Sequence, residues 1–292
     1  MPLMPIGDYT VDRVVELECT PFGAREFFPD LSAEMLEHCR AVLPPGHITA
    51  DNLLSMSFHG FVLRTGRHTI LIDTCCGNDK ERPARPMFHR LRTNYLDKLA
   101  AAGVKPEQVD YVMCTHLHWD HVGWNTQLID GRWVPTFPNA KYIMARGEYE
   151  HWDGVYSRGD ASVHRAAFED SVLPIRRAEQ AVLVDDDFEL EKGIWLEPCH
   201  GHSPGNVVIN LESKGTRAVV TGDVLHHQIQ LVLPEMSTMA DADKNMARKT
   251  RIALIQKHAG TGHLIMPGHF PTPTVGRIEP TPGSRESYRY VS

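Results

Sequence analysis

The sequence predicts an α/β fold in which all 292 residues form one layered domain, 1–292. Three observations favour this fold class. Predicted strands and helices alternate from one end of the chain to the other, which is typical of layered α/β architectures. The length and the 42% hydrophobic content allow a large core. Finally, no low-complexity tract, tandem repeat or long linker separates one part of the chain from another.

The first third of the chain is predicted to contain two strand regions and two helices. Ser32 is a plausible N-cap for the first helix, and Thr65-Gly66-Arg67 is a suitable turn between two antiparallel strands. The second helix follows from the period of its apolar residues. The predicted ranges are a strand at 11–19, a helix at 31–40, a hairpin of 55–64 with 68–73, and a helix at 88–101.

The rest of the chain continues the alternation. Short apolar runs predict strands, and longer segments with helical spacing predict helices. The predicted strands are 111–114, 142–145, 181–184, 218–221 and 264–266, with extended flanks around a turn at 131–140. The predicted helices are 147–152, 160–170 and 241–258.

One stretch, Thr115 to His121, follows the apolar strand at 111–114 and contains three histidines and one aspartate. His116 and His118 project to one side by the two-residue period of an extended chain. After a turn, Asp120 and His121 can face a second point nearby. A lone His-Xaa-His is usually two solvated histidines, but the adjacent Asp-His makes a metal site the better interpretation, with zinc favoured over calcium or magnesium.

Three further segments end a predicted strand or a glycine-rich turn on a residue that can bind a metal. They supply His202, Asp223 and His269. Each would be an ordinary loop residue if it stood alone. Together with the first cluster they complete a set for two metal ions, in which one ion has His116, His118 and His202, the other has Asp120, His121 and His269, and Asp223 bridges them.

Asp73 ends the hairpin strand at 68–73, and two interpretations of it stay open. It could be a surface residue at a strand end. The interpretation we favour is that its carboxylate accepts a hydrogen bond from a metal-binding histidine and so orients the ring.

Charge and composition exclude several classes of function. The formal net charge is −7 and no basic tract is present, so we expect no nucleic-acid partner. We see no membrane-spanning run and no signal peptide at the N-terminus, and we therefore expect a cytoplasmic protein without a membrane partner. The six cysteines show no Cys-Xaa-Xaa-Cys spacing, and without a secretion signal we expect no disulfides.

Four motifs resemble the metallo-β-lactamase superfamily, in the family's order. They are His-Leu-His-Trp-Asp-His at 116–121, Gly-His-Ser-Pro-Gly at 201–205, Thr-Gly-Asp at 221–223 and Gly-His at 268–269. The resemblance implies an αβ/βα sandwich of two mixed β-sheets packed face to face, with helices on the outer faces and the metals at one edge. The branch with methyl parathion hydrolase and the dinuclear quorum-quenching lactonases is the most similar one.

Two positions depart from the pattern of the lactonases. They commonly have a tyrosine three residues after the bridging aspartate, where this chain has His226. That difference puts an acyl-homoserine lactone assignment in doubt. His226 is a candidate proton donor to the leaving group, with a purely structural role equally open. Asn206 replaces a histidine of the family that is not a metal ligand.

The function we expect is a metal-dependent hydrolase of the esterase or lactonase type, homodimeric by the resemblance. Two divalent ions about 4 Å apart can lower the pKa of a bridging water from about 15.7 towards 7. The resulting metal-bridging hydroxide attacks an ester or lactone carbonyl, while Asp120 orients it and takes part in proton transfer. Zinc is the expected metal, with manganese, cobalt or iron as alternatives.

Rival functions are kept open at this stage. A phosphotriester hydrolase of the methyl parathion hydrolase type is the first alternative. Activity as a β-lactamase and an iron-dependent redox enzyme are less favoured. A purely structural metal site is also less favoured, because such sites close their coordination with four ligands and seven candidates are present here.

Overall fold

The computed structural model describes residues 4–284 and 287–292. Contacts between residues divide the chain into two compact units, which are described one at a time. Among the described residues, unit 1 comprises 4–17, 58–188 and 213–215, and unit 2 comprises 18–57, 189–212, 216–284 and 287–292. Strands β2 and β3 each have residues in both units. The single domain expected from the sequence stays a prediction.

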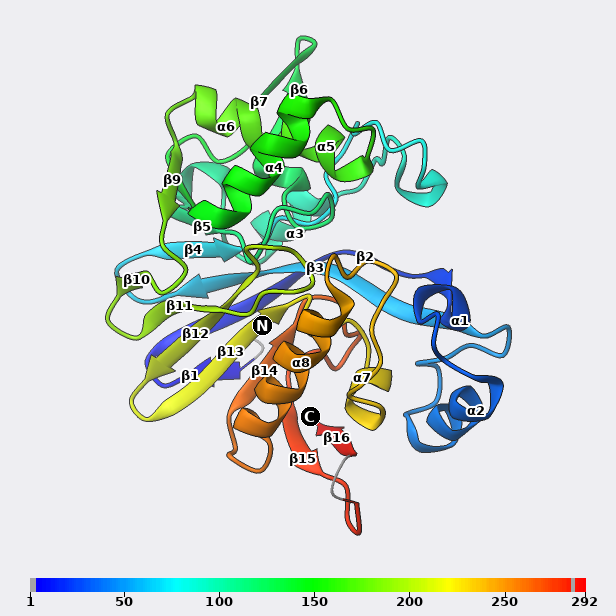
Figure 1. The fold of residues 1–292 in the computed structure, drawn as a ribbon. Helices are drawn as coiled ribbons and strands as arrows, with labels where there is room; N and C mark the ends of the chain where they lie inside the picture. Colours follow the sequence, from blue (N-terminus) through cyan, green and yellow to red (C-terminus); the bar gives the residue numbers. More distant parts are fainter. Residues whose placement is uncertain (1–3, 285–286) are drawn as a thin grey trace. The chain divides into compact units, whose positions relative to one another are not determined.

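Unit 1 is built on a seven-stranded mixed sheet with the order β1-β2-β3-β4-β5-β8-β9 (Figure 1). Strand β3 pairs antiparallel with β4, whereas β4, β5, β8 and β9 are parallel to one another. Residues 70–72 of β4 are completely buried, as expected for a parallel strand that is covered on both faces. The strands are β1 Met4–Ile6, β2 Tyr9–Gly23, β3 Leu53–Arg64, β4 Thr69–Ile72, β5 Tyr111–Met113, β8 Lys141–Ala145 and β9 Ala181–Val184.

Helices and a small hairpin complete unit 1. In α4, the buried residues Glu148, Tyr149, Trp152 and Val155 follow helical spacing, so one face of the helix is buried. The hairpin consists of β6 Thr126–Ile129 and β7 Arg132–Pro135. The helical segments are η1 Pro86–Phe88, α3 Tyr95–Ala101, η2 Pro106–Gln108, η3 Gly123–Asn125, α4 Arg146–Arg158, α5 Val163–Ala167, the π-helical η4 Phe168–Val172 and α6 Leu173–Arg177.

Unit 2 is built on a five-stranded sheet with the order β10-β11-β12-β13-β14, in which β13 and β14 are parallel. Leu254 and Ile255 of α8 pack with Val208, Val219 and Ile265 of the sheet in one apolar core. The strands are β10 Glu189–Glu191, β11 Ile194–Pro198, β12 Val207–Ser213, β13 Thr216–Gly222 and β14 Leu264–Pro267, with the hairpin β15 Arg277–Pro280 and β16 Tyr288–Val291. The helices are α1 Ala24–Phe27, α2 Ala33–Val42, α7 Ile229–Val232 and α8 Lys244–His258.

Most predicted elements are present. The hairpin of β3 with β4 is antiparallel as expected. The Ser32 side chain accepts a hydrogen bond from the backbone N–H of Met35, which confirms the predicted N-cap. The six cysteines are free thiols, as expected. Strand β12, Val207–Ser213, was missed by the sequence analysis.

The predicted helix at 88–101 is wrong over its first half. Helix α3 begins only at Tyr95, and residues 86–88 form a separate 3₁₀ turn. The segment between them is held by side chains instead of helical hydrogen bonds: Asn78 Oδ1 accepts from Thr93 N at 2.8 Å, and His89 Nδ1 accepts from Arg82 N at 2.9 Å. These hydrogen bonds to the segment around Asn78 and Arg82 hold residues 89–93 in a non-helical conformation.

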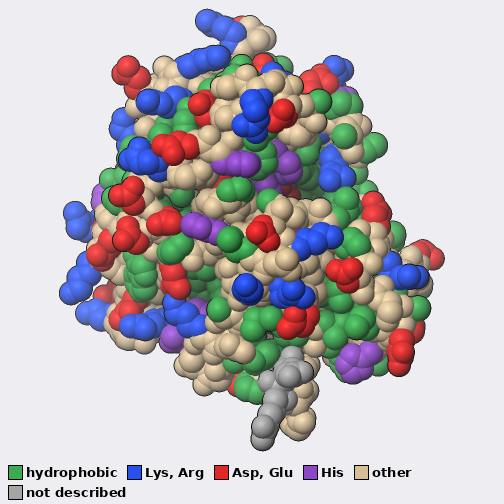
Figure 2. All heavy atoms as spheres, viewed as in Figure 1, with side chains coloured by type: hydrophobic (Ala, Val, Ile, Leu, Met, Phe, Trp, Pro, Cys, Tyr) green, Lys and Arg blue, Asp and Glu red, His purple; other side chains and the backbone are tan. Residues whose placement is uncertain are grey.

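No helix in the described part of the chain is long and apolar enough to cross a membrane. On the face that Figure 2 shows, basic and acidic side chains are interspersed.

A buried ionic cluster in unit 1 joins Lys80 and Arg82 to Asp170 of the π-helical segment. The Arg82 guanidinium donates to both Asp170 carboxylate oxygens, at 2.7 and 3.0 Å. The Lys80 Nζ lies 3.5 Å from Asp170 Oδ1 and donates to Thr126 Oγ1 at 2.6 Å. Burial lowers the pKa of Lys80 to about 7, although Asp170 opposes that shift. The Arg82 guanidinium and, when it is protonated, the Lys80 ammonium therefore share one buried carboxylate.

We predict that Asp170→Asn destabilises the protein by about 3–5 kcal/mol, because it leaves the buried Arg82 guanidinium without its carboxylate. Urea denaturation would measure the free energy of unfolding. The matched control is Asp160→Asn, since Asp160 forms an exposed ion pair with Arg158 whose loss should cost at most about 1 kcal/mol. Equal effects of the two variants would contradict the structural role of the cluster.

Candidate metal centre

In unit 1, the loop after β5 brings three of the predicted ligand histidines together. His116, His118 and His121 are all buried. The ring of His116 lies 4.5 Å from that of His118 and 4.1 Å from that of His121, measured between centroids. Asp120, between them in sequence, is partly buried. Crowding of this kind is costly for polar rings unless their nitrogens are satisfied.

Asp73 organises this loop from the end of β4. Its Oδ1 accepts from Thr115 N at 2.8 Å, and its Oδ2 lies 2.8 Å from Thr115 Oγ1 and 2.9 Å from His121 Nδ1. The residue has φ +55°, which aspartate tolerates better than most side chains. A Cβ on Gly60 of β3 would lie 2.4 Å from the Asp73 carbonyl oxygen, so only glycine fits there. The predicted role of Asp73 as acceptor for a histidine is confirmed.

Two side chains near the loop were missed by the sequence analysis. The buried Glu148 carboxylate accepts from Leu117 N at 3.0 Å and from Trp152 Nε1 at 2.7 Å, and so fixes the loop between His116 and His118. His164 lies with its ring centroid 3.9 Å from that of His118. Both residues lie in helices, α4 and α5, and no motif in the sequence of these helices indicates a contact with the histidine loop.

In unit 2, His202, Asp223 and His269 meet. Asp223 Oδ1 lies 3.1 Å from His269 Nε2, and Asp223 Oδ2 lies 3.3 Å from His202 Nε2. The two oxygens of one carboxylate thus face two different imidazoles. Two ligand atoms of a tetrahedral zinc ion, each about 2.1 Å from it, lie roughly 3.4 Å apart, which is near these separations.

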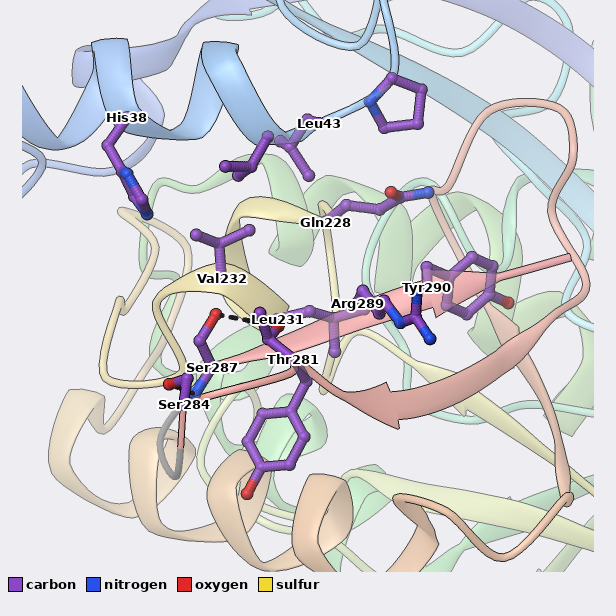
Figure 3. Close-up of a pocket in the computed structure, with 13 residues that line it drawn as sticks. His38, Leu43, Gln228, Leu231, Val232, Thr281, Ser284, Ser287, Arg289 and Tyr290 are labelled. Atoms are coloured by element: carbon purple, nitrogen blue, oxygen red, sulfur yellow. Dashed lines mark hydrogen bonds between the residues drawn. The ribbon is translucent and has the colours of Figure 1, made fainter.

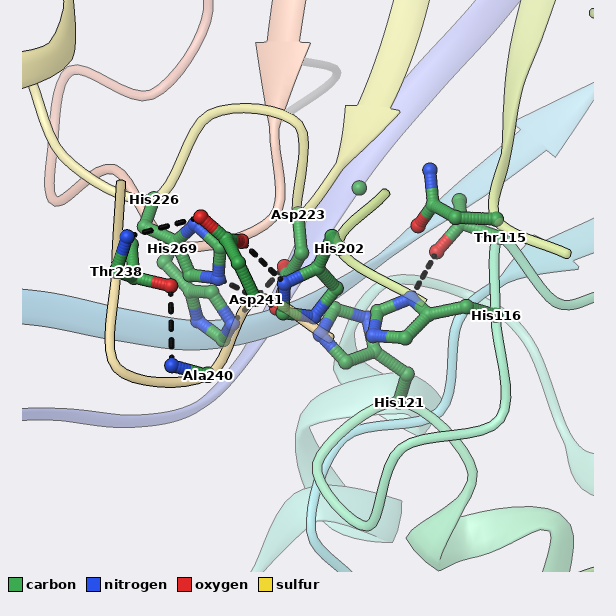
Figure 4. A network of polar contacts seen from close by, with 12 residues as sticks. Thr115, His116, His121, His202, Asp223, His226, Thr238, Ala240, Asp241 and His269 are labelled. Carbon is green, nitrogen blue, oxygen red and sulfur yellow. Dashed lines mark hydrogen bonds and ion pairs between the residues drawn. The ribbon is translucent and has the colours of Figure 1, made fainter. Parts of the chain in front are cut away.

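The opposite ring nitrogens of these two histidines are also held. His269 Nδ1 lies 3.1 Å from the Ser57 carbonyl oxygen, which can only accept a hydrogen bond. His202 Nδ1 lies 3.1 Å from Asp241 Oδ1, and Asp241 Oδ2 accepts from Thr238 N at 2.9 Å (Figure 4). Burial acts to raise the pKa of Asp241, but the His202 contact and other favourable interactions outweigh it and bring the pKa to about 2.

His226 lies against the same carboxylate. Its Nε2 is 3.1 Å from Asp223 Oδ2, and its backbone N–H donates to Gln230 Oε1 at 2.8 Å. The Phe27 ring contacts it edge-on at 5.4 Å between centroids. Burial lowers the pKa of His226, although Asp223 opposes this. His202, His226 and Asp241 also offer ligand atoms within 4.8 Å of one another.

The donor chemistry of both clusters fits metal ions. Four predicted ligand histidines have Nδ1 directed at an oxygen, which is the usual arrangement when Nε2 binds a metal. The pairs are His116 with Thr115 Oγ1 at 3.1 Å, His121 with Asp73, His202 with Asp241, and His269 with the Ser57 carbonyl. A neutral His269 with its proton on Nδ1 turns a lone pair at Nε2 towards the Asp223 carboxylate, and that contact is repulsive unless a cation or a proton lies between them.

Each unit therefore contains buried histidines and carboxylates suited to a metal. His116, His118, Asp120 and His121 belong to unit 1, whereas His202, Asp223 and His269 belong to unit 2. The assignment of these seven residues to two particular ions stays a prediction. Asn206, which is not expected to be a ligand, donates from Nδ2 to the Cys199 carbonyl oxygen at 3.1 Å.

Comparison with protein families gives one clear match. Residues 60–269 match the model of the Metallo-beta-lactamase superfamily. Among curated proteins, the N-acyl homoserine lactonase of Bacillus cereus is 26% identical over 186 residues, which are 59% of this chain and 65% of that enzyme. The N-acyl homoserine lactonase AttM of Agrobacterium fabrum is 39% identical over 56 residues, which are 19% of this chain and 18% of that protein.

Solved structures show the same fold. The hydrolase AbOPH of the beta lactamase superfamily aligns with a TM-score of 0.83 and 23% identity, over 99% of this chain and 95% of that one. AidC, a dizinc quorum-quenching lactonase, aligns with a TM-score of 0.77 and 19% identity over the same shares. The mixed α/β sandwich expected from the sequence is thus confirmed.

We predict that Asp73→Asn weakens metal binding about 10- to 100-fold, because the loss of a partner that orients a ligand histidine typically has that effect. Titration of the purified protein with zinc in the presence of a competing chelator would measure the affinity. Asp110→Asn is the control: Asp110 precedes the same strand, β5, and its carboxylate accepts a backbone N–H from Thr69 in an exposed position. An unchanged affinity in Asp73→Asn would show that Asp73 has a purely structural role.

Proposed function

We propose that this chain, which belongs to the Metallo-beta-lactamase superfamily, is a dinuclear metal-dependent hydrolase of esters or lactones. The observation that supports it best is the position of Asp223, whose two oxygens face Nε2 of His202 and His269. The opposite nitrogen of each ring lies against an acceptor. Each imidazole therefore meets an acceptor on both sides, a conflict that a metal ion bound at Nε2 of each ring would remove.

The lactone part of the proposal comes from the relatives. The curated relatives of Bacillus cereus and Agrobacterium fabrum are N-acyl homoserine lactonases, and AidC was solved with a product, N-hexanoyl-L-homoserine. His226 stands three residues after Asp223, where lactonases of this kind commonly have a tyrosine, so we do not extend the proposal to an acyl-homoserine lactone. Esters and lactones share the acyl carbonyl and the oxygen leaving group, and we propose that class.

The residues of this chain have distinct roles in the proposed reaction. When bound, divalent ions lower the pKa of coordinated water towards 7 and polarise the substrate carbonyl. Asp73 and Asp241 keep His121 and His202 in fixed orientations through Nδ1. Asp120 orients the attacking water and accepts its proton, for which a partly buried carboxylate is suited.

His226 is the proposed proton donor to the leaving oxygen. Its backbone is fixed by Gln230 and its ring by the edge of Phe27. Its Nδ1 makes no hydrogen bond among the described residues. The step requires the protonated ring, which the Asp223 carboxylate favours against the effect of burial. A fixed imidazolium in this place would donate its proton to the leaving oxygen without a change of conformation.

A cytoplasmic location and a homodimeric state are further proposals. The location rests on the sequence, and the homodimer rests on the resemblance to the lactonase branch.

We predict about two zinc ions per chain in the purified protein and hydrolysis of an aryl ester or a lactone in a panel of substrates. The panel contains aryl esters, γ- and δ-lactones, a β-lactam and a phosphotriester. Asp223→Ala should lose both metal and turnover, because it removes the carboxylate that faces two imidazoles. Elemental analysis and initial rates would measure the two quantities on the same preparation.

The control for that experiment is Asp30→Ala, which removes an exposed carboxylate in the same unit. It should keep metal content and rate. One iron per chain without any hydrolysis would refute the proposal. If the phosphotriester is hydrolysed fastest of all the substrates, the chain is a phosphotriester hydrolase and not an ester or lactone hydrolase.

We predict that His226→Asn lowers kcat about 100-fold for an alkyl ester or lactone at unchanged metal content, since loss of a general acid typically costs 10²–10⁴-fold. For a nitrophenyl ester the loss should be much smaller, because nitrophenolate leaves without protonation. Equal losses for the two substrates would show that His226 has a structural role.

A further inference from the structure

Unit 2 contains a cavity of about 500 Å³ that none of the predicted metal ligands lines. Its walls come from the end of α2 and the residues after it, from α7 and from the segment that ends in β16 (Figure 3). The volume lies within the range of small-molecule sites in proteins. The proposed hydrolysis gives this cavity no role.

The middle of the cavity is apolar. Leu43, Leu231 and Val232 line it, and the last two are buried. Val42 also lines the cavity but is 54% exposed, so it marks a side that is open to water. Such a lining favours a hydrocarbon chain, because each methylene that leaves water for an apolar surface strengthens binding.

Two polar side chains in the lining are suited to bind an anion. Gln228 is only 4% exposed, yet its carboxamide makes no hydrogen bond among the described residues. Its amide group is accessible from the cavity, where it can donate a hydrogen bond to an oxygen of a ligand. Arg289 also lines the cavity, and among the described residues its guanidinium forms no ion pair.

The remaining polar groups fit the same kind of ligand. Thr281 and Ser287 contribute hydroxyls, with their oxygens 3.4 Å apart. No acidic side chain is among the described residues of the lining. A cation would therefore meet no carboxylate there, whereas a carboxylate could accept charge-assisted hydrogen bonds, which are the stronger ones.

We propose that this cavity binds an amphipathic carboxylate, such as a medium-chain fatty acid, with its chain against Leu43, Leu231 and Val232 and its carboxylate near Gln228 and Arg289. This inference goes beyond the proposed hydrolase activity and does not depend on it. The short helix α7 contacts both the cavity and the surroundings of His226. Its residues Leu231 and Val232 line the cavity, and its residue Gln230 accepts a hydrogen bond from the backbone N–H of His226.

Calorimetric titration with octanoate would test the proposal, with 1-octanol and octylammonium as probes of the same chain length. We expect one octanoate per chain and weaker binding of the other two. Arg289→Gln should weaken octanoate binding about tenfold and leave 1-octanol unchanged, because only the charge-assisted contact is lost. The control is Arg277→Gln in the same β15–β16 hairpin, since Arg277 does not line the cavity.

Two further variants locate the bound octanoate. Val42→Trp, at an exposed position, should weaken both octanoate and 1-octanol by obstructing the cavity. Asp223→Ala should bind octanoate as the unchanged protein does, which separates this site from the proposed metal centre. The proposal is overturned if octanoate binding is absent at millimolar concentration, if it equals that of 1-octanol, or if it is lost in Asp223→Ala and kept in Arg289→Gln.

Discussion

The contact of the Asp223 carboxylate with the predicted ligands His202 and His269 is the constraint on which the candidate centre depends. His202 and His269 meet it through Nε2, while their Nδ1 atoms face Asp241 and the Ser57 carbonyl. A neutral imidazole has one donor and one acceptor nitrogen, so it cannot donate on both sides. A proton or a metal ion must therefore lie between each Nε2 atom and the Asp223 carboxylate. Because both His202 and His269 have an acceptor on each side, we favour metal ions.

In each of the two units, a carboxylate orients the ring of a predicted ligand histidine. In unit 1, Asp73 lies at the end of a parallel strand and fixes His121, much as Asp241 fixes His202 in unit 2. Asp73 also accepts a hydrogen bond from the backbone N–H of Thr115, and Asp241 accepts one from the backbone N–H of Thr238. Their negative charge is therefore stabilised before any metal binds, and the histidine rings are held ready.

Loops rather than strands contribute the reactive groups, and rigid elements fix those loops. Glu148 of α4 holds the loop around Leu117, and Gln230 of α7 holds the backbone of His226. The same short helix borders the cavity that Gln228 and Arg289 line. A ligand in the cavity would thus contact the element that positions His226, so the fold offers a physical route by which binding at one place could influence the other.

The sequence by itself determined the candidate ligands and about half of the strands. The signal was local, because a buried apolar run followed by histidine or aspartate is visible within about ten residues, as at 111–121, 218–223 and 264–269. The predicted helix at 88–101 failed because Asn78 and Arg82, from another segment, bind its first half. Only the tertiary structure could decide such contacts between distant residues.

The hydrogen-bond acceptors of the histidines could likewise be identified only from the tertiary structure. Asp241 lies 39 positions from His202, and Ser57 lies 212 positions from His269. Neither pair has a sequence pattern, since any carboxylate or carbonyl could serve as the acceptor. Gln228, Arg289 and the cavity walls are likewise far apart in sequence. The residue types that bind a metal are thus determined locally, whereas the orientation of each ring and the shape of each cavity follow from packing between distant segments.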